Sequence, residues 1–210
     1  MIRIAVADDH AVVRKGVRQI ISESDDLHVA GEAASADELL TLLRSQSFDL
    51  VVLDLSLGAR SGIDLLKQIK GEFSELPVLI LSMHAENLFA VRALRAGARG
   101  YVQKEEAAEE LVLAIRRIAA GGMYVSPSMS EKIAGDIARG GAITLPHERL
   151  SDREFEIFRL IGSGKSVGEI AKAVNLSVKT VSTHRTRVLE KTGLRNNAEI
   201  VYYVMTNRLT

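Results

Sequence analysis

The first 120 residues alternate between short apolar runs and longer amphipathic stretches, and the alternation repeats five times. The runs are rich in Val, Ile and Leu, without interleaved polar residues, which is typical of strands covered on both faces. A strand followed by a helix, five times over, predicts a parallel sheet with helices on both sides. The expected strands are 2–7, 28–33, 50–53, 78–81 and 100–102.

The stretches between the runs have the period of amphipathic helices. Right-handed crossovers between parallel strands leave few possible topologies. The predicted fold class of residues 1–120 is therefore α/β, a doubly wound (βα)5 domain. The expected helices are 11–22, 36–44, 62–73, 86–96 and 107–120.

Residues 121–147 are predicted to be a linker with one short helix. Gly121-Gly122 would end the last helix of the first domain. Ser126-Pro127 would begin the short helix and Gly140-Gly141 would end it, because proline suits the first turn of a helix and glycine its end. Pro146 is expected in a loop beyond it.

Residues 148–210 show no strand pattern and are predicted to form a small all-α domain of four helices. Capping boxes of the form Ser-x-x-Glu begin the first two helices at Ser151 and Ser166, and Ser177 caps the third. Only Val174-Asn175-Leu176 separate the second helix from the third, as in a helix-turn-helix. The four helices are expected at about 151–162, 166–173, 177–193 and 197–206.

The composition excludes several classes of protein. With 47% hydrophobic and 26% charged residues, the chain is not largely disordered. It has no cysteine, which excludes disulfides and thiolate metal sites and fits a cytoplasmic location. No apolar run approaches the roughly 20 residues that span a bilayer, and two early acids argue against a signal peptide. We therefore expect a cytoplasmic protein without a membrane partner.

The net charge of zero conceals an asymmetry between the two domains. Residues 148–210 contain 11 Lys and Arg against 7 Asp and Glu, and the rest of the chain has the opposite excess. A basic second domain suits a polyanionic partner, although an excess of this size also arises by chance.

Polar side chains follow four of the predicted strands. Asp8-Asp9, Asp54 and Ser82 stand at the ends of the first, third and fourth strands, and Lys104 lies just past the fifth. The carboxyl ends of parallel strands converge at one edge, where such folds bind ligands. Three carboxylates gathered there would need a counterion, and Mg²⁺ prefers such oxygen ligands.

A carboxylate beside such a cation is a possible nucleophile toward phosphorus. The transferred group carries about two negative charges, which a lysine and a hydroxyl would help to hold. Taken singly, each residue has an ordinary interpretation, since an Asp at a strand end is most often a helix cap or a solvated loop residue. Their joint occurrence favours a functional site.

Residues 1–120 resemble the receiver domain of response regulators. The resemblance implies that a sensor histidine kinase phosphorylates Asp54. It implies that Mg²⁺ is held by Asp9, Asp54 and the Ser56 backbone carbonyl, with Asp8 acting through water. Lys104 would hold the phosphoryl oxygens, Ser82 would move toward them, and Tyr101 would swing inward as a switch. The matching positions are Asp8-Asp9, Asp54, Ser82, Tyr101 and Lys104, the serine and lysine 28 and 50 residues beyond Asp54.

Two positions depart from that family's pattern. Gly58-Ala59 stand where Pro-Gly is common, so the loop is less restricted and the lifetime of the phosphoryl group or the docking of partners is expected to differ. Glu105 replaces a proline that often follows the lysine. Neither change removes a reacting group.

The third helix of the second domain has the two faces that a DNA recognition helix needs. Val181, Val188 and Leu189 are expected to face the core, with Val178 near the start of the helix. The plainer interpretation is a solvated amphipathic helix, but acids are scarce and a capped helix and tight turn precede it. The outward residues are basic or carry hydroxyls: Lys179, Ser182, Thr183, Arg185 and Arg187.

Residues 148–208 resemble the LuxR-type helix-turn-helix of the NarL/FixJ subfamily. The resemblance implies that 179–187 enter the major groove and that Val201, Tyr202 and Val204 offer a dimer face. Ser182 stands where lysine is frequent and Val167-Gly168 where Asn-Lys is, so some backbone contacts to DNA are expected to change. The carrying residues are Leu150-Ser151-Asp152-Arg153-Glu154, Gly164-Lys165-Ser166, Glu169-Ile170-Ala171, Leu176-Ser177, Thr180-Val181, His184 and Lys191-Thr192-Gly193-Leu194. The expected DNA contacts are Lys179, Thr180, Ser182, Thr183, His184, Arg185 and Arg187.

Together the two resemblances predict a response regulator rather than an enzyme. Phosphorylation of Asp54 would release the second domain and favour a homodimer on paired sites in double-stranded DNA. Two alternatives stay open: an aspartyl-phosphate hydrolase, which leaves the second domain unexplained, and a DNA-binding regulator controlled without phosphorylation. The complete set of acids disfavours the latter, while the missing Pro-Gly keeps it open.

Overall fold

The computed structural model describes residues 1–57, 62–83, 86–105, 108–127, 130–131, 145–207 and 209. The chain divides into two compact units, Met1–Gly135 and Asp136–Thr210. The Gly58-Ala59 loop and most of the short helix expected between Ser126 and Gly140 lie outside the described residues.

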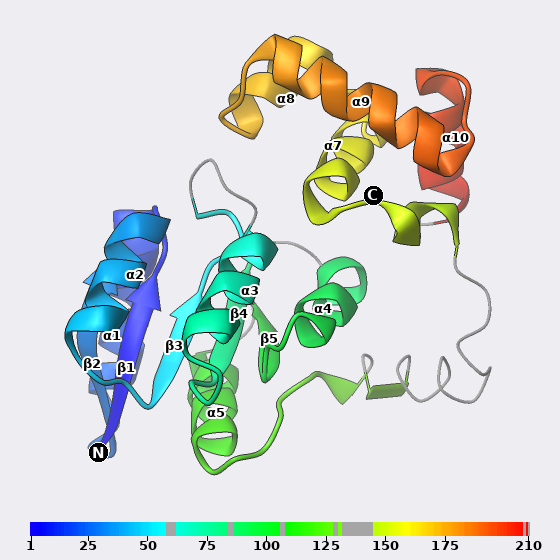
Figure 1. Cartoon of the computed structure of the whole chain (residues 1–210). Helices are drawn as coiled ribbons and strands as arrows, with labels where there is room; N and C mark the ends of the chain where they lie inside the picture. The colour runs from blue at the N-terminus through cyan, green and yellow to red at the C-terminus, as the bar shows by residue number, and fades with distance from the viewer. Residues whose placement is uncertain are drawn as a thin grey trace. The chain divides into compact units, whose positions relative to one another are not determined.

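The first unit is an α/β fold on a five-stranded parallel sheet with the order β2-β1-β3-β4-β5 (Figure 1). The predicted fold class is confirmed, and the element bounds differ from the prediction by one residue at most. The strands are β1 (Ile2–Ala7), β2 (Leu27–Ala33), β3 (Leu50–Leu53), β4 (Val78–Ser82) and β5 (Gly100–Gln103). The helices are α1 (Ala11–Ser22), α2 (Ala36–Ser45), α3 (Gly62–Glu72), α4 (Glu86–Arg95) and α5 (Ala108–Ala119).

Both faces of this sheet are buried. Successive residues of a strand point to opposite faces, so Val52 and Leu79 pack with α1 and α5 in one core. Val51 and Ile80, one position away, are equally buried and belong to the other face, on the side of α2, α3 and α4 (Figure 1). Burial on both faces explains why the strands read as continuous apolar runs.

The segment after α5 adds a feature that the sequence did not indicate. Tyr124 returns to the sheet beside β5, where its N–H donates to the Arg99 carbonyl and its carbonyl accepts from the Tyr101 N–H. A Cβ at Gly100 would lie 2.7 Å from the Tyr124 carbonyl oxygen, so only glycine permits this close approach. The first residues of the predicted linker therefore extend the sheet of the first unit.

The described residues of the second unit form helices and no strand, as predicted. Both predicted capping boxes form, Ser151 with Glu154 and Ser166 with Glu169. Pro146 was expected in a loop, but it begins a short 3-10 turn, where its fixed φ fits. The elements are η1 (Pro146–Arg149), α7 (Asp152–Gly162), α8 (Val167–Ala173), α9 (Val178–Thr192) and α10 (Asn197–Thr206).

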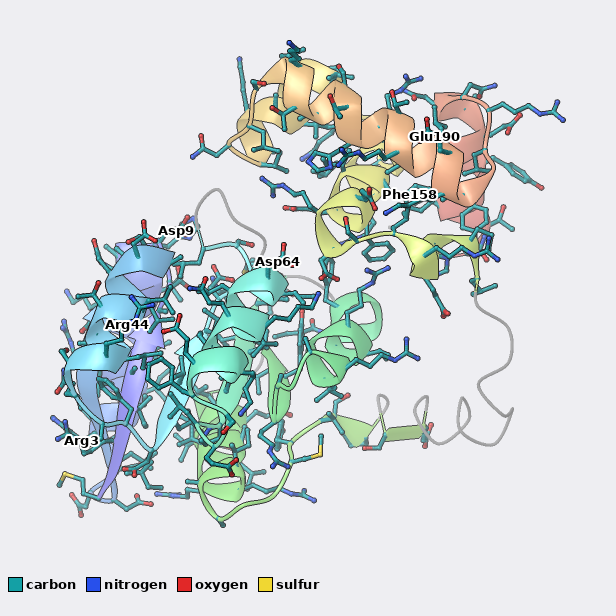
Figure 2. All side chains as sticks on the ribbon, in the orientation of Figure 1. Arg3, Asp9, Arg44, Asp64, Phe158 and Glu190 are labelled. Atoms are coloured by element: carbon teal, nitrogen blue, oxygen red, sulfur yellow. The ribbon has the colours of Figure 1, made fainter. Side chains whose placement is uncertain are left out.

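The core of the second unit lies between α7, α9 and α10. Figure 2 shows Phe158 of α7 directed into it, and the Phe158 ring contacts those of Phe155 and Tyr203. In the turn between α8 and α9, Asn175 takes a φ of 51°, a conformation that asparagine tolerates better than most residues. Among the described residues, no helix combines the length and hydrophobicity needed to span a membrane.

Candidate functional site

The predicted acids converge at one edge of the first unit because their strands are parallel. Asp8 and Asp9 follow β1, and Asp54 follows β3, its N–H donating to the Ala7 carbonyl at 2.9 Å. Figure 2 shows Asp9 at the end of the sheet toward which β1 runs, with Arg3 at the opposite end. The structure thus brings together side chains that are 46 positions apart in the chain.

Lys104 forms ion pairs with the two buried carboxylates, those of Asp8 and Asp54. Its Nζ atom lies 2.6 Å from Asp8 Oδ2 and donates to Asp54 Oδ2 at 2.8 Å. Asp8 is 2% exposed and Asp54 is 1% exposed, so these charges interact away from bulk water. The predicted proximity of these three residues is confirmed.

The protonation states of Asp54 and Lys104 follow from their burial and from the ion pair between them. Burial raises the pKa of Asp54, and the Lys104 ammonium and the Ser56 N–H offset this only in part. Burial alone would lower the pKa of Lys104, but Asp54 and Asp8 raise it above its usual value, so the ammonium keeps its charge. Asp54 is thus a desolvated carboxylate with a permanent cation beside it.

Backbone N–H groups hold the described residues that follow Asp54. The Ser56 N–H donates to Asp54 Oδ1 at 3.1 Å, and the Gly62 N–H donates to the Leu55 carbonyl. A Cβ at Gly62 would lie 2.4 Å from the Leu55 backbone, so glycine is required there. Ser56 itself is exposed, and the ligand role of its carbonyl stays a prediction.

Ser82 and Tyr101 lie where their strands were expected to place them. Ser82 is the last residue of β4, is fully buried, and accepts the Lys104 N–H through its carbonyl at 2.9 Å. Tyr101 lies in β5 and is 1% exposed. Its role as a switch that moves on phosphorylation stays a prediction.

Two residues near the acids were missed by the sequence analysis. His10 Nδ1 lies 2.7 Å from Asp9 Oδ1 and 3.3 Å from Asp8 Oδ1. The Arg14 guanidinium donates to the Asp8 carbonyl at 2.6 Å and lies 3.5 Å from Glu32. His10 directly follows the two acids, which was the available signal, whereas the contact of Arg14 with Glu32 of β2 appears only on folding.

The exposed face of α9 contains four of the predicted DNA-contact residues. Lys179, Ser182, Thr183 and Arg187 are exposed, while Val181 and Val188 are buried in the core as predicted. Thr180 is half-buried, and its hydroxyl lies 2.8 Å from that of Ser177, the residue that caps the helix. Its hydroxyl therefore belongs to the helix cap.

Arg185 and His184 differ from the expected pattern. Arg185 was predicted to face outward, but it is half-buried and its Nε donates to Asn197 Oδ1 at 2.6 Å, which ties α9 to α10. Among the described side chains, His184 has a buried Nδ1 atom without a hydrogen-bond partner, and burial lowers the pKa of its imidazole. The predicted DNA contact of His184 stays a prediction.

The expected dimer face on α10 also needs correction. Val204 is fully buried and packs so closely on Gly162 that a Cβ there would clash with it. Tyr202 and Met205 are the exposed large side chains of this helix. Val178, expected near the start of the helix, is the first residue of α9 and is exposed.

Comparison with protein families assigns both units. The family described as response regulator receiver domain matches residues 4–116, which include the whole acidic site. The family described as bacterial regulatory proteins, luxR family, matches residues 148–204, which include α7 to α9. The chain belongs to the NarL/FixJ response regulators. It is a DNA-binding transcription regulator rather than an enzyme.

Curated relatives match this response regulator over almost their whole length. Response regulator UvrY of Escherichia coli is 30% identical over 209 residues, covering 100% of this chain and 96% of the relative. Oxygen regulatory protein NreC of Staphylococcus carnosus is 33% identical over 213 residues, covering 99% of this chain and 98% of the relative.

Solved structures include similar response regulators, one of them bound to promoter DNA. RcsB from Salmonella enterica serovar Typhimurium, bound to promoter rprA in the presence of phosphomimetic BeF3⁻, is 28% identical with a TM-score of 0.65, covering 97% of this chain and 98% of that one. A LuxR-family two-component response regulator from Aurantimonas is 38% identical with a TM-score of 0.61, covering 66% of this chain and 99% of that one.

The acidic site of the response regulator fits a divalent cation. One oxygen or nitrogen atom from each of Asp8, Asp9, His10 and Asp54 lies within 4.8 Å of the others. Three carboxylates and one lysine ammonium leave two negative charges, which match the charge of Mg²⁺. Carboxylate oxygens are also the donors that Mg²⁺ prefers.

Proposed function

We propose that a sensor histidine kinase phosphorylates Asp54 with Mg²⁺ at Asp8, Asp9 and Asp54, and that phosphorylation controls DNA binding by α9. The observation that carries the proposal is the desolvated Asp54 carboxylate, whose Oδ2 accepts from Lys104 at 2.8 Å. The other carboxylates and the ammonium beside it suit the charge of a transferred phosphoryl group.

The chain's own residues would act by orientation and charge. An Asp54 oxygen would form a bond to phosphorus as the bond from phosphorus to the kinase histidine nitrogen breaks. The Lys104 ammonium, already bonded to this carboxylate, would stay with the phosphoryl oxygens. The Ser56 N–H fixes the rotation of the carboxylate through its bond to Oδ1. Bound Mg²⁺ would neutralise part of the charge that develops on the phosphoryl oxygens.

The second unit would bind promoter DNA as a homodimer. The face of α9 that contains Lys179 and Arg187 is exposed, and these two cations are suited to contact phosphates of the DNA backbone. RcsB, a similar protein, has been solved as dimers bound to DNA. The exposed Tyr202 and Met205 of α10 are suitable for contacts between two copies. Both the DNA and the kinase's phosphoryl group are reached from the cytoplasm, which is the location we propose.

Phosphorylation of the full chain by acetyl phosphate and Mg²⁺ tests this proposal. We expect one phosphoryl group on Asp54 by mass spectrometry, and none on the Asp54→Asn variant, because its amide cannot form the acyl phosphate. Asp64→Asn, at an exposed acid of α3, is the matched control and should be labelled like the wild type. A label at another residue, or no label on the wild type, would support the alternative of a regulator controlled without phosphorylation.

A further inference from the structure

His10 has no role in the proposed phosphorylation, yet it lies within the acidic site. Its imidazole Nδ1 is 2.7 Å from Asp9 Oδ1 and 3.3 Å from Asp8 Oδ1. Asp54 provides the remaining donor of a group whose atoms all lie within 4.8 Å of one another. The site therefore offers a nitrogen as well as carboxylate oxygens.

His10 Nδ1 forms ion-pair contacts with Asp8 and Asp9, and the same distances match those between neighbouring ligands of one metal ion. A six-coordinate cation with bonds of about 2.1 Å has adjacent donors about 3 Å apart. The two distances from His10 Nδ1, 2.7 Å and 3.3 Å, lie on either side of this value. One cation is therefore able to contact the imidazole and a carboxylate with small adjustments of the side chains.

The structure also allows the imidazole to make these adjustments. The backbone N–H of His10 donates to Asp8 Oδ1 at 2.8 Å. This bond fixes the backbone of His10 beside the acids at the start of α1. The side chain itself is 66% exposed, so it rotates without disturbing the core. Its backbone is fixed, whereas, among the described residues, rotation of its ring breaks only the contacts of Nδ1 with Asp8 and Asp9.

We propose that His10 is a nitrogen ligand in this site and makes it selective for first-row transition cations, Mn²⁺, Co²⁺ and Ni²⁺, over Mg²⁺. Imidazole suits these cations, whose affinity rises from Mn²⁺ to Ni²⁺, whereas Mg²⁺ prefers oxygen. The inference rests on the proposed function, because the same carboxylates would hold Mg²⁺. Transition cations would therefore compete with Mg²⁺ for the site that precedes phosphorylation.

Pulsed electron paramagnetic resonance of Mn²⁺ on the full, tag-free chain tests the ligand directly. We expect a nitrogen coupling from a coordinated imidazole in the wild type and none in His10→Ala. His28→Ala is the matched control, because His28 is exposed on β2 and pairs in register with Arg3, far from the acids along the sheet. Bound Mn²⁺ without a nitrogen coupling in the wild type would overturn the proposal.

Calorimetric titrations with Ni²⁺ and with Mg²⁺ separate this inference from the proposed function. His10→Ala should weaken Ni²⁺ binding by at least about tenfold and change Mg²⁺ binding by less than about twofold, because Mg²⁺ uses the oxygens. Equal losses for both cations would overturn the nitrogen ligand and leave the carboxylate site intact. Failure of the wild type to bind either cation would instead contradict the proposed function, and with it this inference.

Discussion

At the scale of single residues, the acidic site is controlled by one ammonium group. Lys104 forms ion pairs with oxygens of both Asp8 and Asp54. A divalent cation attracted to those carboxylates is repelled by the same lysine. The lysine that would hold the phosphoryl group should therefore weaken the binding of the metal.

Replacement of Lys104 by methionine should strengthen Mg²⁺ binding. The substitution keeps the length of the side chain and removes its charge, so we expect roughly a three- to tenfold higher affinity, by the loss of one nearby like charge. Calorimetric titration at pH 8 measures this. Lys67→Met, at an exposed position on α3, should leave the affinity unchanged. An unchanged or lower affinity of Lys104→Met would contradict this view of the site.

Two arginines of α9 should have separable effects. Arg187→Ala should weaken binding to a random-sequence DNA duplex and reduce the dependence of log K on log salt by about 1, because one phosphate contact is lost. Fluorescence anisotropy at several salt concentrations provides both values. The fold should be unaffected, since Arg187 is exposed.

Arg185 links α9 to Asn197 of α10 at 2.6 Å. Asn197→Ala, which breaks the same bond while keeping the arginine, should therefore lower stability by about 1 kcal/mol and leave the salt dependence unchanged. If Asn197→Ala alters the salt dependence as Arg187→Ala does, the structural assignment of Arg185 is wrong.

At the scale of helices, two capping boxes with the same sequence pattern have different surroundings. Glu154 of α7 is 3% exposed and accepts from Lys191 Nζ of α9 at 2.7 Å. Glu169 of α8 is exposed. Among the described residues, its carboxylate accepts hydrogen bonds from Ser166 alone. The first box therefore joins two helices, whereas the second serves its own helix.

The capping box at the start of α7 should make the stability of the second unit depend on pH. Burial alone would raise the pKa of Glu154, but Lys191 and Ser151 favour its carboxylate and hold the pKa below the usual 4.5. A carboxyl group with a lowered pKa stabilises the fold fully above its unfolded pKa and loses this as pH falls through the folded pKa. The second unit should therefore lose stability as the pH falls below about 4.5.

Glu154→Gln should remove part of this acid dependence and lower stability at pH 7 by about 1–2 kcal/mol, a Tm decrease of roughly 5–15 °C for a domain of this size. Thermal unfolding, followed by the amide signals of α7 to α10, measures both. Glu169→Gln is the control and should shift Tm less. Equal shifts in the two variants would show that the contact with Lys191 contributes nothing.

At the scale of the whole molecule, two compact units share one chain, and the proposed function requires communication between them. Acetyl phosphate should increase the DNA affinity of the full chain by roughly 5- to 150-fold, the usual range of coupling between sites. Footprinting measures the affinity and sedimentation measures the dimer. Asp54→Asn should show neither increase. Equal affinities of wild type and Asp54→Asn under phosphorylating conditions would contradict the coupling.

The sequence by itself determined the elements and their order. Buried strands read as apolar runs because both faces of the sheet are covered, and the capping boxes indicated the starts of α7 and α8. The residues that meet in the acidic site were also predictable, since the ends of parallel strands must meet at one edge. These features depend on local patterns and on the geometry of parallel strands.

Only the tertiary structure decided which side chains share a contact. The bond between Arg185 and Asn197, the burial of Val204 against Gly162 and the return of Tyr124 to β5 join residues by packing between elements. The period of a helix shows which residues share a face, but the neighbouring helix determines how much of that face is covered. For this reason Arg187 of α9 is exposed, whereas Arg185 is half-buried and bonds to Asn197 of α10.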